Sequence, residues 1–442
     1  MEKLYHALPS FVQDYALSCK GYLINKSRYN QDFYSALDEL ENNNFSHFSD
    51  LEKYKEEKFQ DLLSKIAENK LSLARFQHLY GRIDSFSSLK DVDNLPITKK
   101  SDIQSALLKF PAESATKDYI HHTSGTTGSG LIYPVSPISD AYQWAVWWRY
   151  RKIHNIDFDT VCGYFGGRSI VSPNERKRFH RYNFASKQIM FSAYHLNKSN
   201  LDSYVSGIKS YGVSWLHGYP SFLTDFASLC LDNDIDLTGF INIVTIGAES
   251  LLPHQKFIIN KAFGCPVVQH YGLSESVANI SENIDGDLVV DDDFSHVSFL
   301  KNDLEQFRIV GTNLYNSATP FLNYYTGDLV TSYEVRDDKR VVKDIDGRKE
   351  DSLLLNDGSK IGRLDHIFKD IYQVREVQFI QKRRGEVDLN IVKSSLYTSE
   401  VEELILHECN RRFNGRIKIN LKYLEHIPKT KSGKLRFVIS KV

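Results

Sequence analysis

Short apolar runs alternate with helical segments between residues 161 and 270, and this alternation restricts the fold more than any other feature of the sequence. Runs with the length of buried strands occupy residues 161–165, 213–216, 241–246 and 266–270. Segments with the apolar spacing of helices lie between them, at residues 201–211, 221–231 and 253–263. Strands and helices that alternate at this spacing predict an α/β domain built on a parallel sheet.

The region before this alternation, up to about residue 110, is expected to be mostly helical. Apolar residues recur three and four positions apart at 33–37 and across 59–79, with Lys, Glu and Gln between them. Pro111 marks the end of the region, and residues 99–103 look like the start of a helix with Ser101 as its N-cap.

The end of the chain has a different pattern. Residues 344–351 are charged and rich in turn formers, which predicts a domain boundary. Beyond it, the sequence predicts a hairpin, a helix and a strand, at residues 377–392, 399–413 and 417–424. The fold class expected is therefore α/β, with a large multi-sheet N-terminal domain (1–346, helical over 1–110) and a small α+β C-terminal domain (347–442).

Composition excludes several other classes of protein. With 442 residues the chain is too long for one hydrophobic core, and a net charge of -1 favours neither nucleic acid nor an anionic membrane as partner. The five cysteines are dispersed and odd in number, which argues against a disulfide framework or a zinc cluster. No apolar run has the length of a membrane span or the form of a signal peptide, so a cytoplasmic protein is expected.

The run from His122 to Gly130 is dense in hydroxyl residues and glycine. Backbone amides can converge on an anion where glycine leaves room, and hydroxyl groups add donors that rotate to suit phosphate oxygens. The alternative is an ordinary surface loop of small residues. Two polar groups, Gly247-Ala248-Glu249 and His270-Tyr271-Gly272, follow predicted strands, where ligands of parallel sheets collect. A nucleotide is expected to meet the loop there.

Five stretches, taken in order, resemble the motifs of the adenylate-forming superfamily of acyl-CoA synthetases, peptide-synthetase adenylation domains and luciferases. They are the phosphate loop at 123–128, Tyr-Gly-Leu-Ser-Glu at 271–275, Tyr-Thr-Gly-Asp-Leu at 325–329, the hinge at 347–351 and the lysine loop at 428–434. Gly166-Gly167 and the run at 357–365 look closest to the phenylacetate-CoA ligase branch, and within it to CapK-type proteins encoded among surface-polysaccharide genes.

The resemblance implies roles for single residues. Lys434 is expected to bridge the attacking carboxylate and the α-phosphate, and Glu275 to be catalytic as the ligand of Mg²⁺. Asp328 would accept hydrogen bonds from the ribose, and Arg348 would contact ribose or phosphate. The full nucleotide-binding set expected is Thr123, Ser124, Gly125, Thr126, Thr127, Gly128, Gly247, Ala248, Glu249, His270, Tyr271, Gly272, Ser274, Asp328 and Arg348. The hinge residues are Lys349 and Glu350, about which the C-terminal domain of family members reorients.

Each role has a simpler alternative, and the sequence departs from the family pattern. Glu275 can be a solvated acid, Asp328 a turn cap and Lys434 part of a solvated basic tail. The family's phosphate loop commonly continues with a Lys, whereas Ser129-Gly130-Leu131 follow here. Asn323 stands where the family commonly has Arg, and Glu350 where it has Asp.

The acyl pocket is expected near strand ends. Its candidate residues are Tyr164, Phe165, Gly166, Trp215, His217, Gly218 and Tyr219. For any one of these residues, packing in the core is an equal alternative.

The resemblance implies a ligase that uses ATP and Mg²⁺ to adenylate a small or aromatic carboxylic acid and then passes the acyl group to an acceptor. The first hypothesis is transfer to coenzyme A. The second is an amide- or ester-forming ligase that transfers to an amino sugar or polysaccharide precursor, and the third is a non-catalytic nucleotide-binding protein with the same fold. Ligases of the phenylacetate type are often dimers, so a homodimer is also considered.

Overall fold

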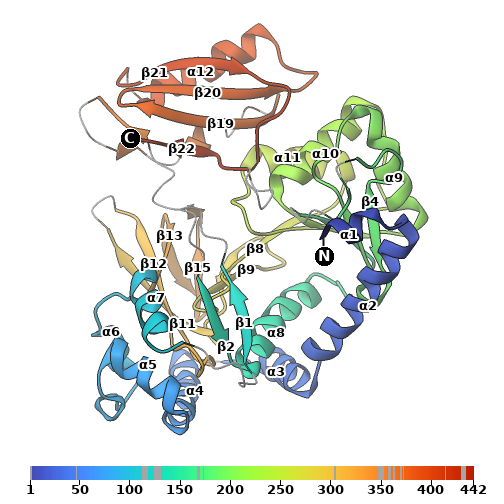
Figure 1. Cartoon of the computed structure of the whole chain (residues 1–442). Coiled ribbons are helices and arrows are strands. Elements are labelled where there is room, and N and C mark those ends of the chain that lie inside the picture. Colours follow the sequence, from blue (N-terminus) through green and yellow to red (C-terminus); the bar gives the residue numbers. More distant parts are fainter. Residues whose placement is uncertain are drawn as a thin grey trace. The chain divides into compact units, whose positions relative to one another are not determined.

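The computed structural model describes most of the chain, which divides into two compact units. The described residues are 2–45, 47–111, 118–123, 131–166, 170–172, 174–302, 305–346, 353–356, 360–361, 364–368, 371, 373–413, 415–429 and 435–442. The first unit comprises Met1–Leu23, Phe158–Gln269 and Gly347–Val442, and the second comprises Ile24–Asp157 and His270–Asp346. Figure 1 labels many elements of the two units, which are described separately below.

The N-terminal region is helical, as predicted. Its helices are α1 (Glu2–Ala7), α2 (Ser10–Arg28), α3 (Gln31–Asn42), α4 (Phe48–Glu68), α5 (Lys70–Tyr80), η1 (Ile83–Ser85), α6 (Lys90–Asp93) and α7 (Lys100–Lys109). The predicted helical stretch 59–79 is interrupted at Asn69, whose side chain accepts hydrogen bonds from the amides of Leu71 and Ser72 (both 3.0 Å) and caps α5. The predicted N-cap at Ser101 is wrong. Helix α7 begins at Lys100 with Lys99 as its N-cap residue, and the Asp102 carboxylate accepts a hydrogen bond from the Lys99 amide at 2.8 Å.

The core of the second unit lies between its helices and the segment around Tyr315. Phe33 of α3 and Phe59 of α4 are fully buried there, together with residues of α8 (Pro137–Ile153). The rings of Tyr142 on α8 and Tyr315 stack with centroids 3.7 Å apart. Aromatic side chains bury large areas and dominate such cores, so this cluster holds the helices against the strands that follow.

The strands of the second unit form a hairpin and two sheets. They are β1 (Tyr119–His122), β2 (Ile132–Val135), β9 (Asn279–Glu282), β10 (Leu288–Val290), β11 (Ser295–Lys301), β12 (Phe307–Asn313), β13 (Tyr324–Val330), β14 (Tyr333–Arg336), β15 (Lys339–Val342) and β16 (Ile345–Asp346). β1 pairs with β2, and β11-β12-β13-β16 form an antiparallel sheet. β14, β15, β10 and β9 continue to the last residues of β8, which belong to this unit.

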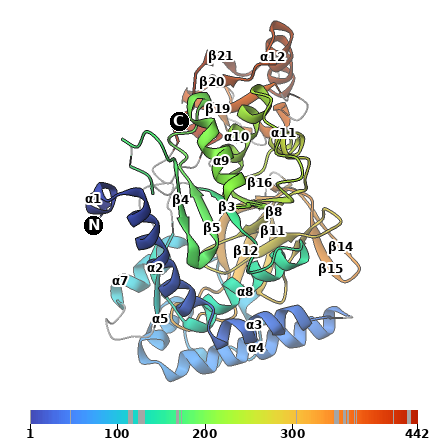
Figure 2. The same ribbon diagram turned by 90° about the vertical axis from the view of Figure 1, so that its right-hand side faces the viewer.

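The first unit contains the parallel sheet predicted from the sequence. Its strands are β3 (Cys162–Phe165), β4 (His180–Asn183), β5 (Gln188–Phe191), β6 (Trp215–Gly218), β7 (Ile243–Ile246) and β8 (Val267–Gly272), in the order β8-β7-β6-β3-β5-β4. All pairs are parallel except β4 with β5. Figure 2 shows helices α9 (Leu201–Ser210) and α10 (Pro220–Asp232) beside this sheet, and α11 (Pro253–Phe263) is the third helix of the group.

The two faces of this sheet have different chemistry. Phe165, Leu216, Val244 and Ile246 point into one hydrophobic core with α9, α10 and α11. Side chains alternate between faces along a strand, so Tyr164, Trp215, His217 and Thr245 lie on the opposite face, where Tyr164, His217 and Thr245 are in register with one another. The sheet therefore has one apolar face and one face of aromatic and polar side chains.

The C-terminal part of the first unit is a small α+β module. Its elements are β17 (Leu353–Leu354), β18 (Lys360–Ile361), η4 (Leu364–Phe368), β19 (Val374–Arg383), β20 (Glu386–Lys393), α12 (Ser399–Phe413), β21 (Lys418–Tyr423) and β22 (Val438–Ser440). The predicted hairpin is present, with Gly385 at φ +70° in its turn. α12 buries Val401, Ile405, Cys409 and Phe413 on one side. The boundary predicted at residue 347 stays a prediction.

His254 on α11 makes the stability of the first unit sensitive to acid. The side chain is 1% exposed, and burial lowers its pKa to about 4 from 6.5. Below pH 6.5 the unfolded chain binds a proton that the folded chain accepts only near pH 4, so stability falls across this window as the pH falls. We expect a loss of about 3 kcal/mol from this group between pH 7 and pH 4.

Replacing His254 with Gln is expected to remove that part of the pH dependence. The measurement is the free energy of unfolding in denaturant at several pH values, and the slope against pH is compared with that of the parent protein. His407→Gln on the exposed side of α12 is the matched control. Equal slopes for the His254 variant and the parent would contradict the assignment.

Candidate active site

The predicted phosphate loop connects the two strands of the β1–β2 hairpin. The ends of the loop are tied together, because the Thr123 amide donates to the Leu131 carbonyl (2.9 Å) and the Leu131 amide donates to the Thr123 hydroxyl (2.8 Å). Thr123, assigned to the nucleotide from sequence, thus has a role in closing the loop. Residues Ser124, Gly125, Thr126, Thr127 and Gly128 lie outside the described residues.

Glu275 lies in a tight turn that side chains from distant strands support. The Glu275 side chain is 8% exposed, and the hydroxyl of Tyr324 on β13 donates to its Oε1 at 3.4 Å. Asn313 on β12 donates to the Glu275 carbonyl at 3.0 Å, and Tyr133 on β2 donates to the Ser274 carbonyl at 2.5 Å. The turn is therefore held by three strands, which places one buried carboxylate at a defined position.

The structure joins two of the predicted motifs by a direct hydrogen bond. Tyr271, at the end of β8, donates from its hydroxyl to Oδ2 of Asp328 on β13 at 2.8 Å, across 57 positions of sequence. Burial raises the pKa of Tyr271, and the negative charge of Asp328 adds to the effect, so the phenol stays protonated and donates. The Asp328 amide also donates to the Thr326 hydroxyl at 3.1 Å. Asp328 is thus oriented by its own motif and by Tyr271.

His270 and Gly272 flank Tyr271 and have packing roles in the structure. The centroid of the His270 ring lies 5.9 Å from that of the Trp147 ring and 5.2 Å from that of the Tyr150 ring. Burial, with a smaller contribution from Arg151, lowers the pKa of His270 to about 3, so the ring is neutral at pH 7. A Cβ on Gly272 would lie 2.7 Å from Oδ1 of Asn279, so a larger residue here would have to displace that side chain.

Several candidate pocket residues lie on the aromatic and polar face of the parallel sheet. Thr245 accepts a hydrogen bond from Trp215 Nε1 (2.7 Å) and bonds to His217 Nδ1 (2.8 Å). The Tyr164 and His217 rings are 5.9 Å apart. Tyr164, Trp215 and His217 therefore form one cluster on neighbouring strands, and their assignment to an acyl pocket stays a prediction.

The other candidate pocket residues are buried in the core or lie close against neighbouring segments of the chain. Phe165 is fully buried between Phe191 and Phe222, with ring centroids 4.7 and 4.9 Å away, which fits the core-packing alternative. A Cβ on Gly218 would lie 2.0 Å from the Phe165 carbonyl oxygen, and one on Gly166 would lie 2.3 Å from the Tyr164 hydroxyl oxygen. The Tyr219 amide donates to the Phe165 carbonyl at 2.9 Å.

Gly247, Ala248 and Glu249, which follow β7, make contacts that the sequence does not predict. The Gly247 amide donates to the Gly218 carbonyl at 3.3 Å, and Ala248 adopts φ +69°. The Glu249 carboxylate accepts from the amides of Leu435 and Ser221. The remaining candidates Arg348, Lys349, Glu350 and Lys434 lie outside the described residues.

Sequence reasoning missed the residues that support the Glu275 turn. Tyr133, Asn313 and Tyr324 lie on three different strands, far from residue 275 in the chain. No local pattern marks these side chains, because their hydrogen-bond partners are set by how the strands pack. Tyr324 adjoins the 325–329 motif, which is the one signal that could have drawn attention to it.

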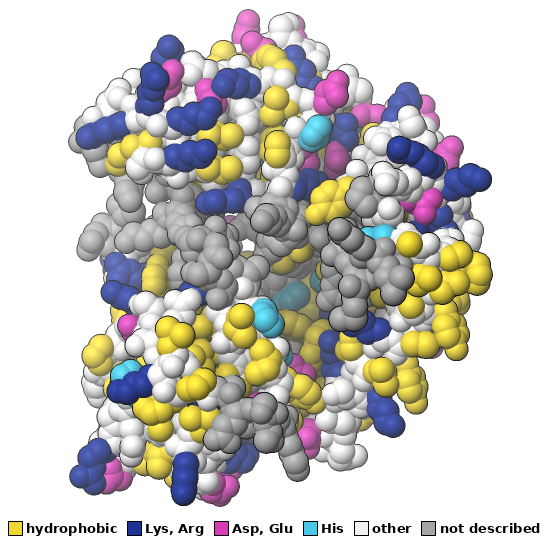
Figure 3. All heavy atoms as spheres, viewed as in Figure 1, with side chains coloured by type: hydrophobic (Ala, Val, Ile, Leu, Met, Phe, Trp, Pro, Cys, Tyr) yellow, Lys and Arg dark blue, Asp and Glu magenta, His cyan; other side chains and the backbone are white. Residues whose placement is uncertain are grey.

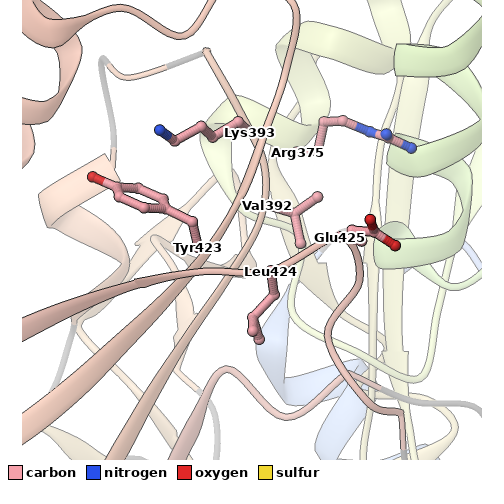
Figure 4. Close-up of a pocket in the computed structure, with 6 residues that line it drawn as sticks. All are labelled: Arg375, Val392, Lys393, Tyr423, Leu424 and Glu425. Atoms are coloured by element: carbon pink, nitrogen blue, oxygen red, sulfur yellow. The ribbon is translucent and has the colours of Figure 1, made fainter.

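The C-terminal module carries an open pocket of about 470 Å³ that offers no convergent binding site. Lys and Arg side chains gather on the face of this module in Figure 3. Figure 4 shows that the Lys393 and Tyr423 ends of the pocket point away from the Arg375 guanidinium. Arg375 pairs with Asp225, and the Lys393 ammonium lies 3.6 Å from the Tyr423 ring centroid. Arg375 and Lys393 thus interact with side chains of the same chain instead of pointing together at one ligand.

Comparison with known proteins gives matches over the C-terminal region and over the whole chain. Residues 353–441 match the CapK C-terminal domain family. The sequence is 25% identical to Protein CapK of Staphylococcus aureus over 99% of both chains. Among the described residues, no helix is both long and apolar enough to cross a membrane.

Two solved structures that are similar in fold are CoA ligases. A 2-hydroxyisobutyryl-CoA ligase, solved in the postadenylation state in complex with R3-HIB-AMP, is similar with a TM-score of 0.62 and 14% identity, over 88% of this chain and 91% of that one. The anthranilate CoA ligase AuaEII, in complex with anthranoyl-AMP, is similar with a TM-score of 0.50 and 14% identity, over 72% of this chain and 65% of that one.

Proposed function

The chain has the fold of the adenylate-forming ligases and carries a CapK C-terminal domain at residues 353–441, and from this we propose that it is an ATP-dependent acid ligase. It joins a small or aromatic carboxylic acid to AMP and then transfers the acyl group to an acceptor, first of all coenzyme A. The observation that supports this proposal most directly is the hydrogen bond between Tyr271 and Asp328, which links two of the motifs.

The first step is the attack of a substrate carboxylate oxygen on the α-phosphorus of ATP. The bond from the α-phosphorus to the bridging oxygen breaks, and pyrophosphate leaves with that electron pair. Both reactants are anions, so the protein contributes positioning and neutralisation of charge. In the second step a thiolate or amine of the acceptor attacks the acyl carbonyl carbon, and AMP leaves.

Asp328 and the loop at 124–128, which belong to the second unit, are assigned to the nucleotide. Asp328 accepts hydrogen bonds from the ribose hydroxyls, since a carboxylate has acceptor capacity beyond its bond to Tyr271. The loop at 124–128 holds phosphate oxygens. Lys434 brings a positive charge to the reacting carboxylate and α-phosphate. The cluster of Tyr164, Trp215 and His217 on the polar face of the parallel sheet is assigned to the acyl group.

Glu275 fits a magnesium ligand by its chemistry. Mg²⁺ prefers hard oxygen donors and is often bound through one carboxylate together with substrate phosphates. Glu275 supplies one such carboxylate, 8% exposed and held in a turn by Asn313 and Tyr133. When bound, Mg²⁺ supplies neutralisation of the phosphate charge.

Replacing Glu275 with Gln is expected to raise the Mg²⁺ concentration that gives half-maximal pyrophosphate exchange, by about 10-fold or more, because the amide oxygen carries no net charge. The measurement is exchange rate against Mg²⁺ concentration at saturating ATP. Glu334→Gln, at an exposed position on β14, is the control and is expected to leave the curve unchanged. An unchanged curve for the Glu275 variant would remove this residue from the metal site.

The function itself is tested by pyrophosphate exchange over a panel of aliphatic, hydroxylated and aromatic carboxylic acids. Exchange that depends on one class of acid supports the proposal and identifies the substrate. If the purified full chain binds ATP but shows no exchange with any acid, that result would support the non-catalytic alternative.

The second candidate for the acceptor is an amino sugar or polysaccharide precursor. The resemblance to CapK-type proteins favours that pathway context and supplies no acceptor by itself. The active acid from the exchange screen is then given with ATP and either coenzyme A or an amino sugar. A thioester product supports the first acceptor. Turnover that requires the amino sugar supports the second.

A further inference from the structure

Glu249, which follows β7, binds the backbone of the C-terminal loop. Its Oε1 accepts from the Leu435 amide at 2.7 Å, and its Oε2 accepts from the Ser221 amide at 3.3 Å. Ser221 belongs to the first turn of α10, where a negative charge is favourable. Both carboxylate oxygens are therefore engaged by backbone donors, one of them in the residue that directly follows Lys434.

Further contacts of the first unit join the C-terminal module to α10. Arg375 on β19 forms an ion pair with Asp225 on α10, and Ser395 donates a hydrogen bond to Asp232 at the end of the same helix. The Lys429 ammonium lies 5.7 Å from the Phe222 ring centroid and 3.4 Å from the Glu376 carboxylate. These contacts form a docking face on α10, and Glu249 lies beside it at the helix N-terminus.

We propose that Glu249 is a positioning residue, which docks the segment that carries Lys434 while the adenylate is formed, with α10 as the docking face. The inference rests on the proposed function. It gives Glu249 a different role from the nucleotide contact that its sequence context implies.

The hydrogen bond from the Leu435 amide to Glu249 suits the positioning of Lys434 for two reasons. A backbone amide bound by a carboxylate fixes the main chain itself, independently of the side chain at position 435, and hydrogen bonds to charged acceptors are the stronger kind. The lysine must also be released when the acceptor enters, if the module reorients as in the family. A single bond to a side chain, together with one ion pair and a few polar contacts, can be broken in such a motion.

The test compares Glu249→Ala, Glu249→Gln and the neighbouring control Ser250→Ala in the full chain. Pyrophosphate exchange reports adenylate formation, and transfer from a supplied acyl-adenylate to the acceptor reports the second step alone. Hydrogen exchange of the Leu435 amide, measured in overlapping peptides, reports docking without any activity.

For Glu249→Ala we expect kcat of exchange to fall by about 10- to 100-fold, with the KM for ATP within about twofold of the parent, because a small misplacement of a catalytic group costs rate more than binding. Transfer from the supplied adenylate stays within about twofold, since it does not need the docked lysine. The Leu435 amide exchanges faster. Glu249→Gln keeps one carbonyl acceptor. The logarithm of its loss in kcat of exchange is therefore expected to be less than about one third of the value for Glu249→Ala.

Asp225→Asn gives an independent check on the docking face, because Asp225 pairs with Arg375. We expect this variant to slow adenylate formation while transfer stays unchanged, as for Glu249→Ala but less strongly.

A raised KM for ATP with unchanged kcat and unchanged Leu435 exchange would overturn the docking role and restore the nucleotide contact. Equal losses in both half-reactions would also overturn it, because they indicate a general structural effect. If the parent chain shows no pyrophosphate exchange with any acid, the proposed function fails, whereas Leu435 exchange in the variants still decides whether Glu249 docks the loop.

Discussion

Replacing Lys434 with Ala is expected to slow pyrophosphate exchange by about 100-fold or more, because the variant loses the positive charge assigned to the reacting carboxylate and α-phosphate. ATP binding and the thermal unfolding temperature are expected to stay near those of the parent protein. The measurements are exchange kinetics with the preferred acid, ATP binding by calorimetry and a thermal melt.

The same loop offers a matched control in Lys431, three positions earlier in the sequence. Lys431→Ala removes an equal charge and is expected to keep most of the exchange activity. A second readout separates the half-reactions, because transfer from a supplied acyl-adenylate is expected to survive in Lys434→Ala. Unchanged exchange in Lys434→Ala, or equal losses in the two lysine variants, would assign the loop to a solvated basic tail.

Replacing Gly218 with Ala is expected to destabilise the first unit by about 3 kcal/mol or more, because the new methyl group has no room. Its Cβ would lie 2.0 Å from the Phe165 carbonyl oxygen on the neighbouring strand. That carbonyl is held by the Tyr219 amide at 2.9 Å, and Phe165 is fixed in the core, so neither strand can move without breaking other contacts. A melt should show a fall of roughly 10 °C.

Gly212→Ala is the control for this prediction. Gly212 has φ +61° and nothing within 4 Å of an added Cβ, so the variant carries backbone strain without a clash. We expect a cost of about 1 kcal/mol there. If Gly218→Ala melts no lower than Gly212→Ala, strands β3 and β6 approach less closely than the structure indicates.

The elements of the fold were largely predictable because their signals are local. The spacing of apolar residues at 201–211, 221–231 and 253–263 predicted three helices that the structure contains as α9, α10 and α11. The apolar runs between them predicted parallel strands, and β3, β6, β7 and β8 confirm them. The resemblance to the adenylate-forming superfamily and its CapK-like branch is confirmed as well.

The errors came from competition between local signals. Asn69 lies inside a continuous helical pattern, but its side chain accepts hydrogen bonds from two backbone amides and caps a new helix. Near residue 100, Ser101 and Asp102 both have the chemistry of helix-end residues. The structure uses Asp102, whose longer carboxylate reaches back to the Lys99 amide.

The candidate site divides into what motifs identify and what packing decides. The resemblance of two motifs marks Tyr271, Glu275 and Asp328, and their roles, catalytic for Glu275 and nucleotide-binding for the other two, stay predictions. The structure adds that Tyr271 holds Asp328 and that Tyr324, unmarked by any motif, donates to Glu275.

Pattern and covalent spacing alone determined the strands and helices of the parallel α/β sheet and the hairpin and helix of the C-terminal module, because periodicity and turn chemistry act between residues that are close in the chain. Tertiary structure decided which donor meets which acceptor. Tyr164 and Phe165 are neighbours, yet one lies on the polar face and the other in the core. Glu249 binds the Leu435 amide 186 positions away. Such pairings depend on how strands and helices pack, and no local pattern encodes them.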